Sequence, residues 1–289
     1  MQVHFRLLET HPGFREAQFE LEQQARRAMR TGPAAHRTGI VRIPVVVHVV
    51  YEKPEQNITL AQIRSQIRVL NRDFRAKNKD RLGTPQPWQG LVADAAVEFF
   101  LARQDPDGKP TKGVTRTKTA RASFGTGDTV KAAATGGADP WPTDCYLNIW
   151  VCKLGGGLLG YAQFPGGPAQ TDGVVILHRA FGTKGTAAAP FNLGRTTTHE
   201  VGHWLNLRHI WGDTEDCSGT DYVEDTPNAA LPNYGVPAFP SVSCNNGPNG
   251  DMFMNYMDYV DDRAMYMFTS QQVARMRAAL DGPRAAVGG

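Results

Sequence analysis

Three histidines and a glutamate lie within the eleven-residue segment HEVGHWLNLRH, at positions 199 to 209 of a chain that has only eight histidines. On an α-helix, His199 and His203 are four residues apart and lie on the same face, where both imidazoles can bind one cation. Glu200 points about 100° away around the helix axis. We therefore expect it to lie beside the cation and to act as general base and acid on a bound water, without binding the metal.

His209 follows His203 by six residues, which is too far along a straight helix for the two to share a face. The chain must turn back, and Asn206 stands where the turn is expected, because Asn adopts a left-handed conformation at modest cost. Three neutral histidines leave one open position on a tetrahedral Zn²⁺, as in catalytic zinc sites. The alternative is that the histidines are ordinary surface or core residues, but a third histidine at this offset makes chance less plausible.

The whole chain sets the limits for this site. Its 289 residues, 41% of them hydrophobic, can fill the core of one large domain or of two closely packed lobes. A net charge of +3, with no long run of Lys or Arg, predicts no nucleic-acid partner and no membrane partner. The N-terminus lacks the apolar segment of a signal peptide, so we expect any export signal to lie outside this sequence.

Hydrophobic periodicity predicts the elements that must position the histidines. Apolar residues at spacings of three and four, after a capping box that begins at Thr59, predict a helix over 60–76. Further helices are expected over 190–207 and 269–280, and a charged, helix-capable stretch over 14–39. β-branched and apolar runs predict strands over 40–52, 96–103, 146–154, 158–164 and 172–178. This order suggests an α+β domain with an irregular second lobe.

The motif around the histidines resembles the extended zinc motif of the metzincin metallopeptidases, H-E-x-x-H-x-x-G-x-x-H, with Asn206 in place of the glycine. The segments YLNIWVCKLGGGLLGYAQFPGG, DGVVI, DYVEDTP and NYMDYVDD are similar to sequences of the pappalysin family of metzincins. The resemblance covers roughly residues 40–281. It implies a secreted zinc endopeptidase that hydrolyses protein or peptide substrates through a zinc-bound water activated by a glutamate.

The resemblance also implies a domain organisation. We expect a leader or propeptide remnant at 1–39, a metallopeptidase catalytic domain at 40–281 and a tail at 282–289. The N-terminal lobe, about 40–209, would hold a twisted mixed sheet, a backing helix and the active-site helix of a metzincin-type zincin. The C-terminal lobe, about 210–281, would be irregular and would hold a Met-turn and a terminal helix.

Single residues around the metal also take roles from the resemblance, which implies that His199, His203 and His209 bind zinc and that Glu200 is the general base and acid. Met257 would form the Met-turn, a hydrophobic floor below the metal. Tyr259 would stabilise the oxyanion of the tetrahedral intermediate. The alternative for Tyr259 is an ordinary core tyrosine.

The strand LLGYAQF is similar to the strand that borders the substrate cleft in these enzymes. An extended substrate would pair with its free backbone edge, so main-chain hydrogen bonds would supply most of the affinity. The alternative is an ordinary buried strand. The residues expected to contact substrate here are Leu158, Leu159, Gly160, Tyr161 and Ala162.

Four cysteines are present, and the resemblance implies a disulfide between Cys217 and Cys244, worth about 3 kcal/mol in the loop-entropy model. Cys145 and Cys152 cannot bond to each other if both lie on one strand, because they would be about 23 Å apart. Buried free thiols are one state open to them. One disulfide in a loop-rich lobe favours an exported protein.

Between the two expected disulfide partners, the segment CSGTDYVEDTP offers carboxylate, hydroxyl and carbonyl oxygens, which suit Ca²⁺. The resemblance implies a structural calcium site formed by Thr220, Asp221, Val223 and Thr226, with the backbone oxygens of Thr220 and Val223 included. The alternative is a solvated acidic turn.

The sequence departs from its relatives in two places. The first 144 residues contain no cysteine, so latency through a cysteine that blocks zinc is not expected. Relatives that cleave before a basic residue place an acidic residue at the position matching Arg263, in the specificity pocket. An arginine there would repel a basic substrate side chain, although Asp261 or Asp262 pointing inward would reverse this expectation.

Two other functions are compatible with this pattern. A catalytically idle metzincin scaffold that acts as a binding protein would normally have lost Glu200 or a metal ligand, and all of these residues are present. A zinc hydrolase acting on a non-peptide amide would not need the cleft-edge strand. The zinc endopeptidase is therefore the leading hypothesis.

Overall fold

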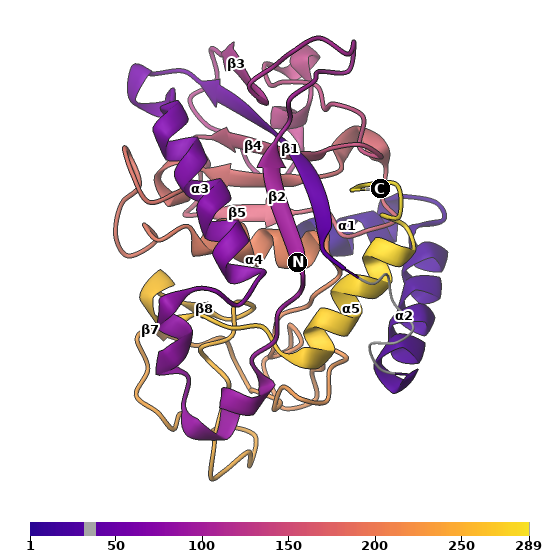
Figure 1. The fold of residues 1–289 in the computed structure, drawn as a ribbon, viewed down its shortest axis with the longest axis vertical. Coiled ribbons are helices and arrows are strands. Elements are labelled where there is room, and N and C mark those ends of the chain that lie inside the picture. Colours follow the sequence, from indigo (N-terminus) through magenta and orange to yellow (C-terminus); the bar gives the residue numbers. More distant parts are fainter. Residues whose placement is uncertain (32–38, 289) are drawn as a thin grey trace.

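The computed structural model describes residues 1–31 and 39–288. Figure 1 shows a twisted sheet with helices beside it and, below the sheet, a part built mainly of loops. The α-helices of the described chain are α1 (Gln2–Thr10), α2 (Phe14–Thr31), α3 (Leu60–Asp73), α4 (Arg195–Trp204) and α5 (Ser270–Asp281). This arrangement confirms the expected α+β class, with the sheet in the N-terminal lobe and an irregular C-terminal lobe that ends in a helix.

The main sheet has six strands, and the order β2-β1-β4-β6-β5 places β5 at one edge, while β3 also pairs with β1. The pairs are parallel, except that β5 is antiparallel to β6. A short second sheet joins β7 to β8. The bounds are β1 (Val41–Tyr51), β2 (Val97–Leu101), β3 (Val114–Lys118), β4 (Leu147–Cys152), β5 (Gly160–Ala162), β6 (Val174–Leu177), β7 (Tyr234–Gly235) and β8 (Tyr259–Val260).

The two faces of the sheet are covered by different parts of the chain. On one face, apolar residues of β1, β4 and β6 pack with those of α3 and α4 in a single core. On the other face, Trp150 and Tyr161 pack with Val3 and Leu7 of α1. Burial on both faces explains why β1 reads as an almost continuous apolar run.

Helix α4, which carries the first two histidines of the motif, is shorter than the expected 190–207. It begins after Gly194, whose φ is +81°, and the Asp262 carboxylate accepts the N–H groups of Leu193 (2.7 Å) and Arg195 (3.2 Å). These bonds hold the preceding residues in a loop. The helix ends before Asn206, which has a φ of +74° and lies in the left-handed region where the turn was expected.

The N-terminal region contains a helix, α1, that the sequence patterns did not indicate, and it is followed by α2, which packs beside α5 (Figure 1). Strand β3 was not predicted either. Residues 32–38 of the expected leader and Gly289 of the expected tail lie outside the described residues. Within the described part, none of the helices combines the length and the apolar character needed to cross a bilayer.

Candidate metal centre and active-site cleft

The three histidines of the motif meet in the interior. The Nε2 atom of His209 lies 3.0 Å from Nε2 of His203 and 3.2 Å from Nε2 of His199. All three side chains are buried. Among the described residues, they form the one group of His, Cys, Asp or Glu side chains close enough together to share a metal ion.

The other ring nitrogen of each histidine faces an oxygen atom. Nδ1 lies 2.7 Å from the Tyr256 carbonyl oxygen in His199, 2.7 Å from the Leu207 carbonyl oxygen in His203, and 2.6 Å from Asp213 Oδ1 in His209. A carbonyl or carboxylate oxygen can only accept, so each Nδ1 carries the proton and each Nε2 keeps its lone pair.

Three lone pairs that face one another at about 3 Å repel, unless a cation lies between them. The pKa values also favour neutral rings: burial lowers the pKa of His199 to about 4 and moves that of His209 well below its ordinary value. Burial and the two neighbouring histidines likewise lower the pKa of His203 well below its ordinary value. Three neutral imidazoles with converging Nε2 atoms fit Zn²⁺.

Glu200 lies next to the edge of the main sheet. A Cβ atom added at Gly160 of β5 would be 2.8 Å from Glu200 Cγ and 2.9 Å from Oε1, so only a glycine lets the strand come this close. Burial raises the pKa of the Glu200 carboxyl to about 8. Glu200 thus lies against the edge strand and lines the same cavity as His199, as expected for a group that exchanges protons with a reacting water.

Tyr259 is not an ordinary core residue. Its ring centroid lies 4.8 Å from that of His209 and 5.6 Å from that of His199, and 39% of the residue is exposed. Met257 is fully buried, and a Cβ atom at Gly202 would lie 2.6 Å from its Sδ atom. Met257 therefore packs directly against α4 beside the histidines, where the Met-turn was expected.

A cavity of about 320 Å³ opens beside Glu200, His199 and Tyr259. Its lining comes from the edge strand and the segment before it, and from Tyr234 and Val260 of the two-stranded sheet. The remaining lining is mainly apolar but includes Asp258 and Asp262. The other residues are Gly157, Leu158, Leu159, Gly160, Phe191, Thr196 and Met265.

Asp262 and Arg263, which gave opposite expectations for the specificity pocket, lie in different environments. Arg263 is exposed and is not part of the lining, which differs from the position expected for it. Asp262 is buried in the lining, and its Oδ1 atom has no hydrogen-bond partner among the described residues. Burial raises the pKa of Asp262 to about 6. Of the two acidic residues considered from the sequence, Asp262 therefore lies at the cavity, and its Oδ2 atom faces the start of α4.

Strand β5 is only three residues long, shorter than the expected 158–164. It pairs with β6 through Tyr161 and Val175, and it is the last strand on its side of the sheet. Tyr161 and Ala162 are buried, whereas Leu158, Leu159 and Gly160 are half-buried. The edge strand thus passes Glu200 at Gly160, with the cavity on the side of residues 157–160.

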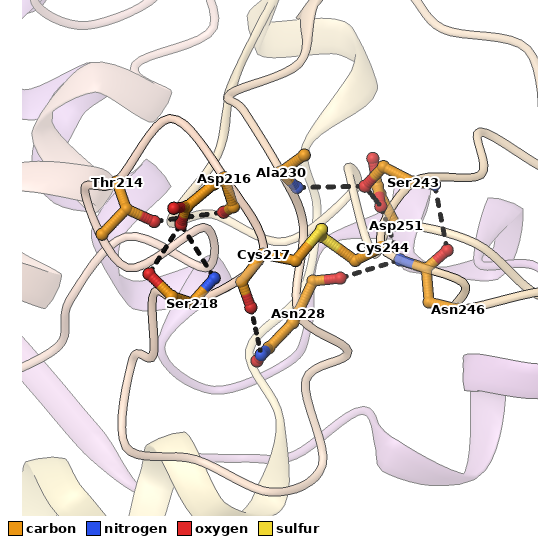
Figure 2. Close-up of a disulfide and its surroundings, with 10 residues drawn as sticks. All are labelled: Thr214, Asp216, Cys217, Ser218, Asn228, Ala230, Ser243, Cys244, Asn246 and Asp251. Atoms are coloured by element: carbon orange, nitrogen blue, oxygen red, sulfur yellow. Dashed lines mark hydrogen bonds between the residues drawn. A yellow bond between two sulfur atoms is a disulfide. The ribbon is translucent and has the colours of Figure 1, made fainter.

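Cys217 and Cys244 form the disulfide that the resemblance implied (Figure 2). Cys152 is buried with a free thiol, as considered from the sequence, and burial raises its pKa. Cys145 precedes β4 and is exposed, so the possibility of a buried thiol holds for Cys152 alone.

The loop expected to bind calcium turns its carboxylate inward. Asp221 is buried, and its two oxygens accept hydrogen bonds from the Thr226 hydroxyl (2.6 Å) and the Val223 N–H (3.1 Å). The Val223 carbonyl oxygen lies 3.3 Å from the Thr226 hydroxyl, while Thr220 is exposed. Asp225 instead accepts the Thr269 hydroxyl (2.6 Å) at the start of α5. Burial of Asp221 argues against a merely solvated turn.

Helices α1 and α2 contact the catalytic part at several points. His4 lies 4.6 Å from the ring of Phe164, which in turn lies 5.2 Å from His203. Arg6 pairs with Asp128. Glu22 and Arg275 form a buried bidentate pair, with distances of 2.6 and 2.8 Å. The first helix therefore lies close to the histidines, against Phe164, and contributes no residue to the lining of the cavity.

Two site residues escaped the sequence analysis. Asp213 ends the segment HEVGHWLNLRHIWGD, four residues after His209, and this proximity was the available signal. Asp258 is buried; its Oδ1 accepts the N–H groups of Asn233 and Tyr259, each at 2.8 Å, and therefore positions Tyr259. Nothing in the spacing distinguished Asp258 from the other acidic residues of NYMDYVDD.

Comparison with known proteins places this geometry in context. Residues 133–281 match peptidase family M43, described as pregnancy-associated plasma protein-A. An extracellular metalloprotease of Pyricularia oryzae is 34% identical over 260 residues, which are 86% of this chain and 78% of that protein. Extracellular metalloprotease 1 of Coccidioides posadasii is 42% identical over 139 residues, 45% of this chain and 48% of the relative.

Two solved structures from Tannerella forsythia are also similar. Mature mirolysin in complex with a cleaved peptide is 52% identical, with a TM-score of 0.85 over 87% of this chain and 97% of that chain. A promirolysin variant is 48% identical, with a TM-score of 0.91 over 99% of this chain and 94% of that chain. The agreement with the promirolysin variant extends over nearly the whole of this chain.

Proposed function

The chain belongs to the pappalysin family, peptidase family M43, and is a metalloendopeptidase; we propose that it cleaves peptide bonds with zinc bound by His199, His203 and His209. The observation that carries this proposal is the convergence of three unprotonated Nε2 atoms, each fixed by an Nδ1 hydrogen bond on the far side of the ring. When bound there, zinc supplies a Lewis acid that polarises a carbonyl group and lowers the pKa of water.

The protein's own groups account for the remaining chemistry. Glu200, beside β5, takes the proton of the attacking water and gives it to the amine nitrogen of the leaving product. The hydroxyl of Tyr259, whose ring lies beside His199 and His209, donates to the oxyanion that develops on the scissile carbonyl. Asp258 supports this role because it holds the backbone N–H of Tyr259.

The direction of the substrate follows from the edge strand. An extended peptide that pairs antiparallel with β5 runs from the Phe164 side towards the Leu158 side. Glu200 lies at Gly160, so residues after the scissile bond lie along 157–160 and the first of them enters the cavity. Residues before the scissile bond would lie towards Phe164, which His4 of α1 contacts.

The cavity sets a preference at the first position after the cut. Its apolar walls suit a long side chain, and the unpartnered Oδ1 atom of Asp262 offers an acceptor at a buried position. A cationic side chain would supply the missing donor and favour the ionised carboxylate. We therefore propose cleavage before Arg or Lys, which reverses the bias expected from Arg263.

Calcium is proposed as a structural ion at the loop of Thr220, Asp221, Val223 and Thr226. Three of these residues already bring a carboxylate, a hydroxyl and a carbonyl oxygen together around Thr226. Oxygen atoms of this kind are the ligands that Ca²⁺ prefers. A bound ion would also compensate the burial of Asp221, which raises the pKa of its carboxyl to about 7.

Residues 1–39 are proposed to be an activation segment that is removed from the working enzyme, leaving a catalytic domain at 40–281 and a short tail. The contact of α1 with Phe164 supports this, because it places α1 at the end of β5 along which residues before the scissile bond would lie. The contrast between the promirolysin variant and mature mirolysin, which match 99% and 87% of this chain, agrees with it.

We also propose that the protein acts outside the cell, because several relatives are named extracellular metalloproteases and a disulfide is present. One experiment tests the proposed function. The purified protein should hydrolyse a denatured protein, lose this activity to 1,10-phenanthroline and regain it with zinc. Tight peptide binding without hydrolysis, even after the N-terminal segment has been cleaved, would instead favour the idle binding scaffold.

A further inference from the structure

A single loop holds an unusual share of the exposed apolar side chains. Eleven large hydrophobic residues are exposed in the described part of the chain, and five of them lie within residues 231–242. They are Leu231 (53% exposed), Tyr234 (69%), Val236 (49%), Phe239 (40%) and Val242 (56%). Single exposed apolar residues need no explanation, but such a concentration is typical of a binding surface.

Hydrogen bonds hold the two ends of this loop in place, so its apolar side chains are exposed on an ordered segment. The Ala230 N–H donates to Ser243 Oγ (3.0 Å), and the Ser243 hydroxyl donates to Asp251 (2.6 Å), next to the disulfide of Cys244 (Figure 2). Further along, the Asp251 N–H donates to the Ser241 carbonyl oxygen at 2.6 Å. The loop is closed at its ends, as in the compact surface loops that often carry function.

The loop is continuous with the cleft. Tyr234 lines the cavity beside Glu200 and pairs with Tyr259 in the two-stranded sheet. The Asn233 amide group and backbone N–H both donate to Asp258, which also lines the cavity. The loop therefore begins at the wall of the cavity, on the side where the substrate residues after the scissile bond lie.

The composition of the loop favours an apolar ligand over a charged one. The sequence LPNYGVPAFPSV contains no charged residue, so it offers no ion pair to a charged partner. Its three prolines restrict the backbone, which reduces the conformational entropy lost when a ligand binds. The exposed fractions of its five apolar side chains are those in the presence of α1 and α2, and neither helix lines the cavity, so this loop is accessible in the full chain.

We propose that residues 231–242 bind apolar side chains of the unfolded substrate, downstream of the residue that enters the cavity. This inference rests on the proposed function, because it assumes that an extended peptide lies along β5. The loop would then select substrates that carry exposed apolar segments after the cleavage site, as denatured proteins do.

Binding of peptides to the full-length, zinc-loaded Glu200→Ala protein tests the proposal without turnover. Two fluorescent peptides begin with the cavity residue and differ only downstream, where one carries Leu and Phe and the other Ser and Gly. Fluorescence anisotropy should give a Kd roughly tenfold lower for the apolar peptide. The double variant Val236→Ser/Phe239→Ser should lose this difference, while Leu82→Ser, which changes an exposed leucine outside the loop, should keep it.

Equal affinities for the two peptides, or the same loss in Leu82→Ser, would overturn the proposal. If the double variant has a lower melting temperature, the single variants Val236→Ser and Phe239→Ser are tested in its place. If both single variants keep the full difference in Kd between the two peptides, the loop does not bind the apolar side chains and the proposal is refuted. Failure of the proposed function is recognised separately. A protein that never hydrolyses denatured protein refutes the peptidase, whereas one that does so without any downstream apolar preference refutes only the role of the loop.

Discussion

The Nδ1 atom of His209 donates a hydrogen bond of 2.6 Å to Oδ1 of Asp213, whereas the Nδ1 atoms of His199 and His203 donate to backbone carbonyl groups. Substitution of a side chain can therefore remove the acceptor of His209, whereas it leaves the backbone acceptors of His199 and His203 in place. A carboxylate partner orients the imidazole and strengthens it as a metal ligand. The His209 ring also stacks on Trp211, with 4.2 Å between the centroids, so Asp213 and Trp211 together fix its position.

Asp213→Ala should weaken zinc binding by about 10- to 100-fold, because His209 loses the acceptor that holds its tautomer and ring orientation. Asp213→Asn should have a smaller effect, since the amide oxygen can still accept the hydrogen bond. Competition with a chelator of known affinity measures both values. Asp216→Ala, in the same segment but exposed, is the matched control, and unchanged zinc affinity in Asp213→Ala would show that the carboxylate has no such role.

Glu200→Gln should retain one equivalent of zinc and lose several orders of magnitude in kcat. The amide has nearly the shape of the carboxylate but cannot take a proton from water. Metal content is read by mass spectrometry, and kcat from cleavage of a quenched fluorescent peptide. A near-normal rate with zinc still bound would contradict the proposed mechanism.

Much of this site was predictable because its chemistry depends on local spacing. The positions of His199, His203 and Glu200 follow from helical geometry, and the turn at Asn206 follows from its tolerance of positive φ. The partner of His209 depends instead on an irregular loop, whose path no periodicity describes. The sequence could therefore not decide which acidic residue would reach the imidazole.

The same distinction applies to the fold. The central strands β1, β4 and β6 were predicted because burial on both faces leaves a continuous apolar run. Strand β3 is largely polar and half-buried, and α1 gains its apolar contacts from a distant part of the chain. The burial of Asp262 in the cavity lining and the exposure of Arg263 also depend on tertiary packing, since the two residues are adjacent in the sequence.

Calcium should raise the melting temperature, because an ion that binds only the folded state stabilises it by about 2.7 kcal/mol at a hundredfold excess over its Kd. For a domain of this size, such a change corresponds to a rise of roughly 5 to 10 °C. Differential scanning fluorimetry with and without millimolar calcium measures it. Asp221→Asn should abolish the calcium effect, whereas the exposed Asp216→Asn should not, and a melting temperature insensitive to calcium would refute the site.

Glu22→Gln should loosen the N-terminal helices, because it leaves the buried Arg275 guanidinium without its ionised partner, at a cost of about 3 to 5 kcal/mol. Limited proteolysis should then remove residues 1–31 faster, and activity on denatured protein should rise. Glu20→Gln, on the same helix but exposed, should behave like the parent protein. Unchanged proteolysis of Glu22→Gln would mean that the ion pair does not hold the segment in place.

The docking of α2 should also weaken in acid. Burial opposes ionisation of Glu22, but the hydrogen bonds and charge of Arg275 outweigh it, so that the pKa of Glu22 is lowered. A lowered pKa means that the contribution of this pair is present above the ordinary value for glutamate and is lost as pH falls through the lowered pKa. Proteolysis of the segment by an acid-active protease should accelerate in that range, and Glu22→Gln should remove the dependence.

Cleavage before Arg or Lys is the outcome expected from the cavity, because Asp262 belongs to its lining and Arg263 does not. Opposite charges about 4 Å apart attract by roughly 4 kcal/mol at an effective dielectric near 20, enough for a preference of about a hundredfold after partial desolvation.

Asp262→Asn should therefore reduce cleavage before Arg strongly and cleavage before Leu much less. Arg263→Ala should change neither by more than about twofold, as is usual for an exposed charge. Digestion of a peptide library, with the cut sites read by mass spectrometry, measures these ratios. A parent enzyme that avoids basic residues, and an Arg263→Ala variant that accepts them, would instead assign the specificity to the arginine.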